Sequence, residues 1–195
     1  MKKNKRVLIL HGLNGSSYPH WQAHLAMDLI KEDFVVSFPE LPNKNSPNLE
    51  AWKEFLKVEL EHFKPDIVVC HSLANILWFH TCDELDIKLE KLMLVAPISR
   101  NRTIEEAKTF FPYPIAKDLK AKEIIMAAST NDPYMSVEEA IELQSKLNIG
   151  MKIMENAGHI NAASGFGKLD CALDWIKRVD ECEINEDVNK ERVKS

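Results

Sequence analysis

Three residues with complementary chemistry stand just after three short apolar runs of the sequence. They are Ser72, Asp132 and His159, and the runs are residues 67–70, 124–128 and 151–154. A serine hydroxyl is a weak nucleophile until a base takes its proton, and histidine serves as that base when a carboxylate fixes its tautomer. Singly, the acid and the histidine could be ordinary loop residues. Together they predict Ser72 as nucleophile, His159 as its base and Asp132 as the residue that orients the base.

The segment around Ser72 predicts a sharp turn between a strand and a helix. It runs Cys70-His71-Ser72-Leu73-Ala74, which corresponds to the pattern G-x-S-x-G with both glycines replaced by small residues. In that pattern the serine lies in a strained turn where only small neighbours tolerate the close approach of strand and helix. Taken alone, the segment is equally compatible with a serine that only caps its helix.

Two backbone segments are candidates for binding a developing oxyanion. The N–H of Leu73 lies at the start of the expected helix, whose positive end favours an anion near the serine hydroxyl. Residues 11–16 (HGLNGS) follow the first apolar run, and their glycines let the backbone approach a substrate closely. We therefore expect the N–H groups of Leu13 and Leu73 to form the oxyanion hole. The glycine spacing matches neither G-x-G-x-x-G nor a P-loop, which argues against a nucleotide cofactor.

Six short apolar runs alternate with segments that carry apolar residues at helical spacing. The expected strands are residues 7–10, 34–38, 67–70, 92–96, 124–128 and 151–154, and the expected helices are residues 21–31, 49–63, 72–82, 137–147 and 168–179. Continuously apolar strands are typical of parallel sheets covered on both faces. The last run contains a lysine, so it is expected at an edge. The alternation predicts a doubly wound, three-layer αβα fold with a mainly parallel six-stranded sheet.

In such a fold the functional crevice lies beyond the carboxyl ends of the strands. The predicted nucleophile, acid and base all follow strands, so they are expected in that crevice. Their order along the chain, serine then acid then histidine, is the order of α/β-hydrolase triads. An α/β-hydrolase-like architecture is therefore expected.

The chain is expected to form one domain, residues 1–180, followed by a charged, flexible tail. This tail, residues 181–195, has almost nothing apolar to pack, so it is expected to be solvated. One long connection, residues 99–118, contains two prolines and is expected to form at most a small cap rather than a large lid.

Aromatic residues in that connection are the expected substrate contacts, because small-ligand sites are mostly apolar. They are Phe110, Phe111 and Tyr113.

Composition and charge argue against several classes of protein. A formal net charge of -5 disfavours nucleic-acid binding, and no segment approaches the roughly 18 apolar residues of a membrane helix. The four cysteines, Cys70, Cys82, Cys171 and Cys182, form no C-x-x-C pair, which predicts reduced thiols in a cytoplasmic protein. His20 and His24 have the spacing of a two-histidine metal face, but no neighbouring acid or cysteine supplies a third ligand, so no metal is expected.

Four blocks of the sequence resemble the family of small serine hydrolases typified by retinoblastoma-binding protein nine and its bacterial relatives. The blocks are residues 11–16 with His20 and Trp21, residues 71–73 (HSL), residues 129–134 (STNDPY) and residues 158–167 (GHINAASGFG). The resemblance covers about residues 5–178. It implies a compact α/β hydrolase with little or no lid and the same triad. Relatives commonly have glycine where this chain has Ala74, whose extra methyl is expected to tighten the turn.

The resemblance implies carboxylesterase-like activity on small acyl esters. We expect an acyl-enzyme on Ser72 that water hydrolyses, without a cofactor, in a chain that is monomeric or weakly homo-oligomeric and binds neither nucleic acid nor membrane. Two alternatives remain open at this point. One is an interaction protein that kept the fold and lost turnover, and the other is a thioesterase or lyase that uses the same triad.

Overall fold

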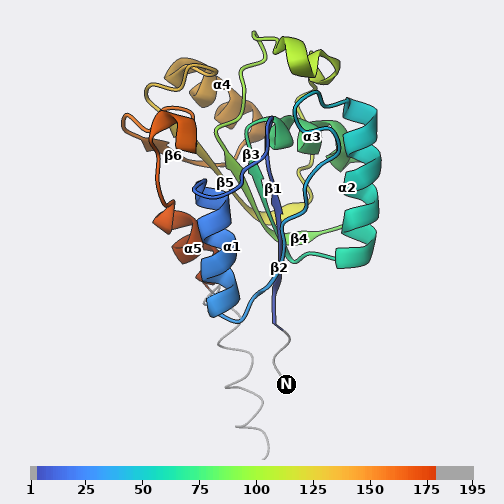
Figure 1. The fold of residues 1–195 in the computed structure, drawn as a ribbon. Helices are drawn as coiled ribbons and strands as arrows, with labels where there is room; N and C mark the ends of the chain where they lie inside the picture. Colours follow the sequence, from blue (N-terminus) through green and yellow to red (C-terminus); the bar gives the residue numbers. More distant parts are fainter. Residues whose placement is uncertain (1–3, 179–195) are drawn as a thin grey trace, which may run out of the picture.

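Six parallel strands form one sheet within residues 4–178, the part of the chain that this computed structural model describes (Figure 1). The strands are β1 (Arg6–Leu10), β2 (Val35–Ser37), β3 (Ile67–His71), β4 (Leu89–Val95), β5 (Ala121–Ser129) and β6 (Gly150–Met154). The helices are α1 (Trp21–Lys31), α2 (Leu49–Phe63), α3 (Leu73–Thr81), α4 (Val137–Leu147) and α5 (Asp170–Lys177). The predicted α/β fold is confirmed, and β6 lies at an edge as expected.

The strand order β2-β1-β3-β4-β5-β6 reverses direction between β1 and β3. The chain adds β2 on one side of β1 and then returns to build the rest of the sheet on the other side. In doubly wound sheets a crevice opens at such a switch point, beyond the carboxyl ends of the strands. The loops after β1 and β3 are therefore the ones that the topology brings to a crevice.

Helices cover both faces of the sheet, which explains the continuously apolar strands. Leu8 and Leu10 of β1 belong to a core shared with α2, α3 and α4. Val7 and Ile9, on the opposite face of the same strand, belong to a second core shared with α1 and α5. Successive strand residues point to opposite faces, so a strand covered on both faces, such as β1 or β3, has apolar residues at nearly every position.

β4 and β5 begin earlier than residues 92–96 and 124–128, which were the ranges expected from the apolar runs. The added residues include Lys91, which is only 5% exposed. Its ammonium group donates to the carbonyl of Trp175 at 2.8 Å and to the carbonyl of Arg178 at 2.7 Å, and lies 3.3 Å from the Glu123 carboxylate. Because this charge has partners inside the fold, the parallel pairing continues beyond the apolar stretch.

Three helices have the ranges expected from their patterns, namely α1, α2 and α4. The helix α4 begins with a capping box in which Ser136 and Glu139 bond reciprocally to each other's backbone N–H. The helix α3 begins at Leu73, because Ser72 has a non-helical backbone conformation, and α5 begins at Asp170, two residues later than expected.

The long connection, residues 99–118, contains one short 3-10 helix, Glu105–Phe110. It lies at the top of Figure 1, beyond the carboxyl ends of the strands, and forms no large lid. No helix in the described residues is both long and apolar enough to cross a bilayer. The tail expected at residues 181–195 lies outside the described residues.

Candidate active site

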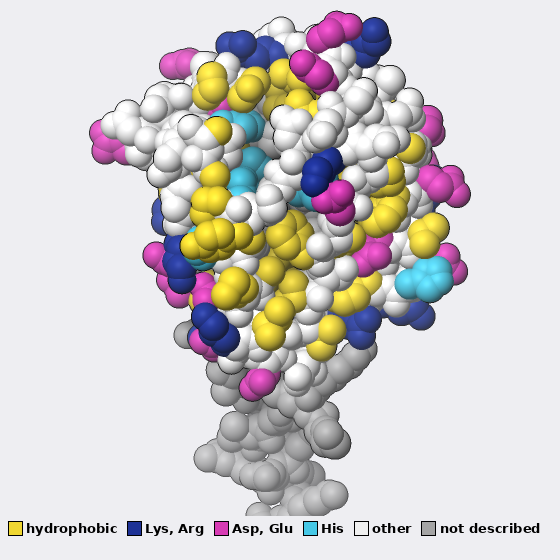
Figure 2. Space-filling model, in the orientation of Figure 1, with side chains coloured by type: hydrophobic (Ala, Val, Ile, Leu, Met, Phe, Trp, Pro, Cys, Tyr) yellow, Lys and Arg dark blue, Asp and Glu magenta, His cyan; other side chains and the backbone are white. Residues whose placement is uncertain are grey.

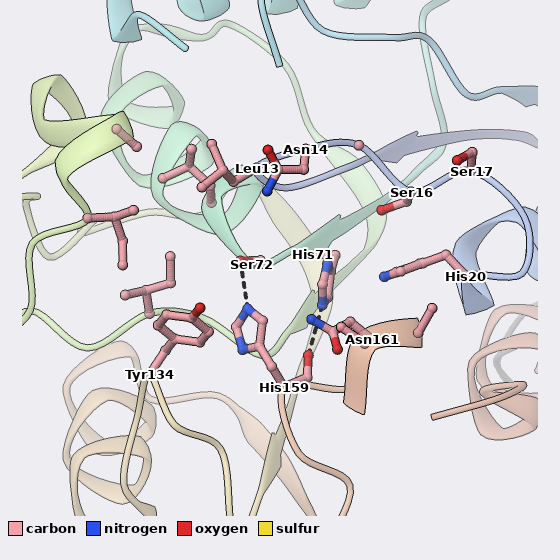
Figure 3. A pocket seen from close by; sticks show the side chains of 17 residues that line it. Leu13, Asn14, Ser16, Ser17, His20, His71, Ser72, Tyr134, His159 and Asn161 are labelled. Atoms are coloured by element: carbon pink, nitrogen blue, oxygen red, sulfur yellow. Dashed lines mark hydrogen bonds between the residues drawn. The ribbon is translucent and has the colours of Figure 1, made fainter. Parts of the chain in front are cut away.

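Three strand ends bring Ser72, Asp132 and His159 together. Because β3, β5 and β6 are parallel, their carboxyl ends lie at one edge of the sheet, the upper edge in Figure 1. His159 Nε2 lies 2.8 Å from Ser72 Oγ, and its Nδ1 lies 3.0 and 2.9 Å from the two Asp132 carboxylate oxygens. These distances are within hydrogen-bond range. The three side chains form one continuous hydrogen-bonded chain, and Figure 3 shows its Ser72–His159 bond.

Ser72 lies in a backbone conformation that L residues rarely adopt, with φ 54° and ψ −119°. Such a conformation persists only where surrounding contacts enforce it. The Ser72 N–H donates to the Val95 carbonyl at 2.9 Å. Asn75 Nδ2 donates to the carbonyls of Ser72 and Val95, each at 2.9 Å. Asn75 is fully buried, and the sequence patterns gave no indication of its role in this turn.

Gly12 approaches Ser72 more closely than any larger residue could. A Cβ placed on Gly12 would lie 2.7 Å from Ser72 Cβ and 3.1 Å from the His71 carbonyl oxygen. The glycine in the first loop is therefore required by contact between the loops after β1 and β3. This contact places the neighbouring Leu13 backbone beside the serine.

The loop that carries Asp132 is joined to the loop that carries the histidine. Asn131 Oδ1 accepts hydrogen bonds from Ser129 Oγ at 2.9 Å and from the Gly158 N–H at 2.7 Å. Ser129 Oγ accepts in turn from the Ala157 N–H at 3.0 Å. These bonds set the distance between the two loops, and with it the distance from the Asp132 carboxylate to the imidazole.

The loop around His159 contains strained residues that tertiary contacts maintain. Ile160 has φ 46°, which is unusual for a β-branched side chain. The Trp21 indole donates to the Ile160 carbonyl at 2.8 Å, and the His159 N–H donates to Ser164 Oγ at 3.0 Å. His71 Nε2 donates to the His159 carbonyl at 3.1 Å. The imidazole is thus positioned by residues from β3, α1 and its own loop.

A cavity of about 280 Å³ opens beside Ser72. Histidine side chains gather in a hollow near the top of the face shown in Figure 2. The lining residues are Leu13, Asn14, Gly15, Ser16, Ser17, His20, His71, Ser72, Leu73, Ile98, Ile104, Ala107, Tyr134, His159, Asn161, Ala162 and Ala163. The lining includes Leu13 and Leu73, whose N–H groups were the expected oxyanion donors. Leu73 is the first residue of α3, where N–H groups have no intrahelical acceptor.

Two further histidines of the lining are uncharged at neutral pH. Burial lowers the pKa of His71 well below its usual range, and the neighbouring His159 and His20 rings lower it further. Burial, again with help from nearby histidines, lowers the pKa of His20 to about 4. These two side chains therefore add polar groups to the cavity wall without adding positive charge.

The aromatic residues expected to contact substrate lie elsewhere, which corrects that prediction. Phe110 and Tyr113 are buried in the core, where Phe110 packs edge-on against Trp52 and Tyr113 stacks on Phe79. Phe111 is packed against the same core. None of the three is in the cavity lining. The aromatic rings of the connection pack into the core, and the connection contributes the smaller apolar residues Ile104 and Ala107 to the cavity lining instead.

No group of three or more His, Cys, Asp and Glu side chains within residues 4–178 is arranged to hold a metal ion. The two histidines that have metal-like spacing face different neighbours. The His20 ring packs against His71, whereas the His24 ring packs against Tyr18.

Comparisons with known proteins agree with this fold. The protein YdeN of Bacillus subtilis is 25% identical over 181 residues, which cover 88% of this chain and 94% of YdeN. The crystal structure of YdeN matches with a TM-score of 0.72 at 22% identity, covering 89% of this chain and 97% of that one. A YdeN-like hydrolase from Pectobacterium atrosepticum matches with a TM-score of 0.72 at 23% identity, covering 88% and 89%.

A more distant fold neighbour is the esterase domain of a Rhodothermus marinus protein, with a TM-score of 0.59 at 12% identity, covering 84% of this chain and 82% of that one. The family model described as serine hydrolase matches residues 7–178. This match includes every strand end described above, and it confirms the family class expected from the sequence blocks. The chain belongs to the serine hydrolase family.

Proposed function

We propose that this chain hydrolyses small acyl esters through an acyl-enzyme on Ser72. The observation that carries the proposal is the unbroken hydrogen-bonded chain from Ser72 Oγ through His159 to Asp132, beside a cavity. A hydroxyl with a base at 2.8 Å can be deprotonated as it attacks.

In the first step Ser72 Oγ attacks the ester carbonyl carbon while its proton moves to His159 Nε2. The negative charge that develops on the carbonyl oxygen is stabilised by the N–H groups of Leu13 and Leu73, and Asp132 stabilises the imidazolium. The C–O bond to the alcohol then breaks, and the alcohol leaves with the proton from His159. Water repeats the sequence on the acyl-enzyme, which releases the acid and restores the serine.

The size and shape of the site support a small substrate. The cavity volume is about 280 Å³, near the lower end of the range typical of small-molecule sites. The connection at residues 99–118 forms no large lid. A fold neighbour named as an esterase domain supports ester chemistry on this fold, although the likeness is one of fold alone.

A fluorophosphonate reagent tests the proposal, because it labels a serine only when a base activates the hydroxyl. We expect labelling of the wild-type chain, hydrolysis of short oxygen esters faster than of matched thioesters, and loss of both labelling and turnover in Ser72→Ala. Ser145→Ala, a change at an exposed position of α4, is the matched control. A folded wild-type chain that is not labelled and hydrolyses no ester would contradict the proposal.

A further inference from the structure

The cavity beside Ser72 has two chemically different sides. Ser16, His20 and Asn161 lie on one side of the Ser72–His159 bond, and Tyr134 lies on the other, where hydrocarbon side chains gather (Figure 3). The apolar members of the lining include Leu73, Ile98, Ile104 and Ala107. The polar side has no role in the chemical steps proposed above.

Ser16 is an unsatisfied polar group on that side. The residue is 5% exposed, and its hydroxyl is buried with no hydrogen-bond partner within residues 4–178. An unpaired buried hydroxyl is unfavourable and rare in folded proteins. Ser16 also belongs to the cavity lining, and its oxygen points toward the cavity (Figure 3). A bound molecule is thus the natural source of the missing partner.

His20 presents one N–H donor to the same place. The Gln22 N–H donates to His20 Nδ1 at 3.2 Å, so this nitrogen acts as an acceptor and carries no proton. Since the ring is neutral, its proton is on Nε2. The far end of the ring points toward the cavity (Figure 3).

Asn161 adds a further donor. Its carbonyl oxygen accepts from the Ser164 N–H at 2.9 Å and from Ser164 Oγ at 2.8 Å. These bonds identify Oδ1 and leave the amide nitrogen as the group available to a ligand. The three side chains therefore converge as hydrogen-bond donors, with the Ser16 hydroxyl also able to accept.

We infer that Ser16, His20 and Asn161 form a subsite for a neutral oxygen acceptor of the substrate, such as an ether, hydroxyl or carbonyl oxygen. This inference rests on the proposed function, because Ser72 must attack an ester elsewhere in the same molecule. Among the described residues, no Asp, Glu, Lys or Arg is in the cavity lining, so neither a carboxylate nor an ammonium group would find a counter-charge there. The hydrocarbon part of the substrate packs on the opposite, apolar side.

Two pairs of isosteric esters test the inference. The first pair is 2-methoxyethyl butanoate and butyl butanoate, which differ by one oxygen on the alcohol side. The second pair is methyl 4-methoxybutanoate and methyl hexanoate, which differ by one oxygen on the acyl side. The preference is the kcat/KM of the ester with the extra oxygen divided by the kcat/KM of its hydrocarbon partner. Comparing this ratio between variants cancels the intrinsic reactivity of each ester.

We expect Ser16→Ala and His20→Phe each to reduce the preference about fivefold in one pair, the typical effect of one lost hydrogen bond. The affected pair identifies the side of the ester that the subsite binds. His24→Phe, the same change one turn further along α1 and outside the lining, should leave both ratios unchanged. Ser16→Ala removes an unpaired hydroxyl, so its thermal stability should not fall. His20→Phe also removes the N-cap of α1, because His20 Nδ1 accepts from the Gln22 N–H. Ser16→Ala therefore tests recognition without that structural change.

Unchanged ratios in both Ser16→Ala and His20→Phe, with all four esters hydrolysed, would overturn the subsite while leaving the proposed function intact. A wild-type chain that hydrolyses none of the esters and is not labelled by fluorophosphonate would overturn the proposed function, and the subsite with it.

Discussion

Gly12, in the loop after β1, contacts Ser72, in the turn after β3. This contact predicts that Gly12→Ala impairs the site. The added methyl would lie 2.7 Å from Ser72 Cβ, so one of the two loops must move. Because a displacement of about 1 Å at a reacting group can reduce rate by a factor of about 100, we expect kcat/KM on a short ester to fall by at least about that factor. Steady-state kinetics measures this fall, and a thermal melt shows whether the variant is still folded.

The matched control for this change is Gly167→Ala. A Cβ placed on Gly167 meets nothing within 4 Å in the described part of the chain, so kinetics and melting temperature should stay close to wild type. Wild-type turnover in folded Gly12→Ala would show that the serine does not depend on this contact.

Asp132→Asn tests the role of the carboxylate without changing its shape. The amide can still accept from the Tyr134 N–H, which lies 2.9 Å from Asp132 Oδ1, so the turn should persist. The neutral side chain stabilises an imidazolium poorly and can favour the wrong histidine tautomer, which in a comparable triad reduces kcat about 10⁴-fold. We expect kcat to fall by about 10³ to 10⁴, measured on a short ester. A loss below about tenfold in a folded variant would contradict the assigned role.

At the residue scale, the sequence predicts which side chains meet where that meeting depends on their position after a strand. Ser72, Asp132 and His159 each follow a strand, and parallel topology alone predicts that they meet. The sequence patterns did not indicate Asn75 or Ser164, because their roles depend on carbonyls and N–H groups that only the folded chain brings near. The patterns placed aromatic residues of the 99–118 connection in the site because the sequence alone does not weigh the packing of these residues against the core.

At the scale of elements, the apolar runs predicted every strand to within one residue at its beginning except β4 and β5, which begin three residues earlier than expected. Residues such as Lys91 and Glu123 look like loop residues in the sequence. The pairing of Lys91 with Glu123 and with two carbonyls at the end of α5 becomes visible only in three dimensions. Helix ranges were easier to predict, because periodicity and caps such as Ser136 are local signals.

Lys91→Met tests how α5 is attached to the sheet. The Lys91 ammonium bonds to two carbonyls at the end of α5, those of Trp175 and Arg178, and methionine would leave them without this donor. Since hydrogen bonds to charged groups contribute about 1.5–3 kcal/mol, we expect the free energy of unfolding to fall by about 2–3 kcal/mol in urea titrations.

The ester kinetics of Lys91→Met should change little, because Lys91 is near the start of β4 and the site is at its end. Lys122→Met, at an exposed position of β5, is the control and should unfold like wild type. Equal stability of the two variants would mean that the buried lysine does not secure the helix.

At the scale of the whole molecule, three buried histidines near the site, His11, His20 and His71, make the stability of the fold depend on pH. His11 must be neutral, because its Nδ1 donates to the Gly12 carbonyl at 2.7 Å while its Nε2 accepts from the Leu41 N–H at 2.8 Å. Burial lowers the pKa of His11, as it does for His20 and His71. In the folded protein these three histidines thus stay uncharged at pH values where a histidine of the unfolded chain binds a proton.

This arrangement predicts that mild acid destabilises the protein. An unfolded histidine titrates near pH 6.5, whereas folded His20 titrates only near pH 4, so between these values the unfolded chain binds more protons. Stability is then full above pH 6.5 and falls with decreasing pH, by about 1.4 kcal/mol per pH unit for each histidine that stays neutral. Urea unfolding between pH 6.5 and 5, where few carboxylates titrate, should show this slope. His20→Gln should reduce the slope of the free energy of unfolding against pH by the contribution of one histidine. His62→Gln, a change at an exposed position, is the control and should leave the slope as it is. A flat profile would mean that protons enter the folded cavity as easily as the unfolded chain.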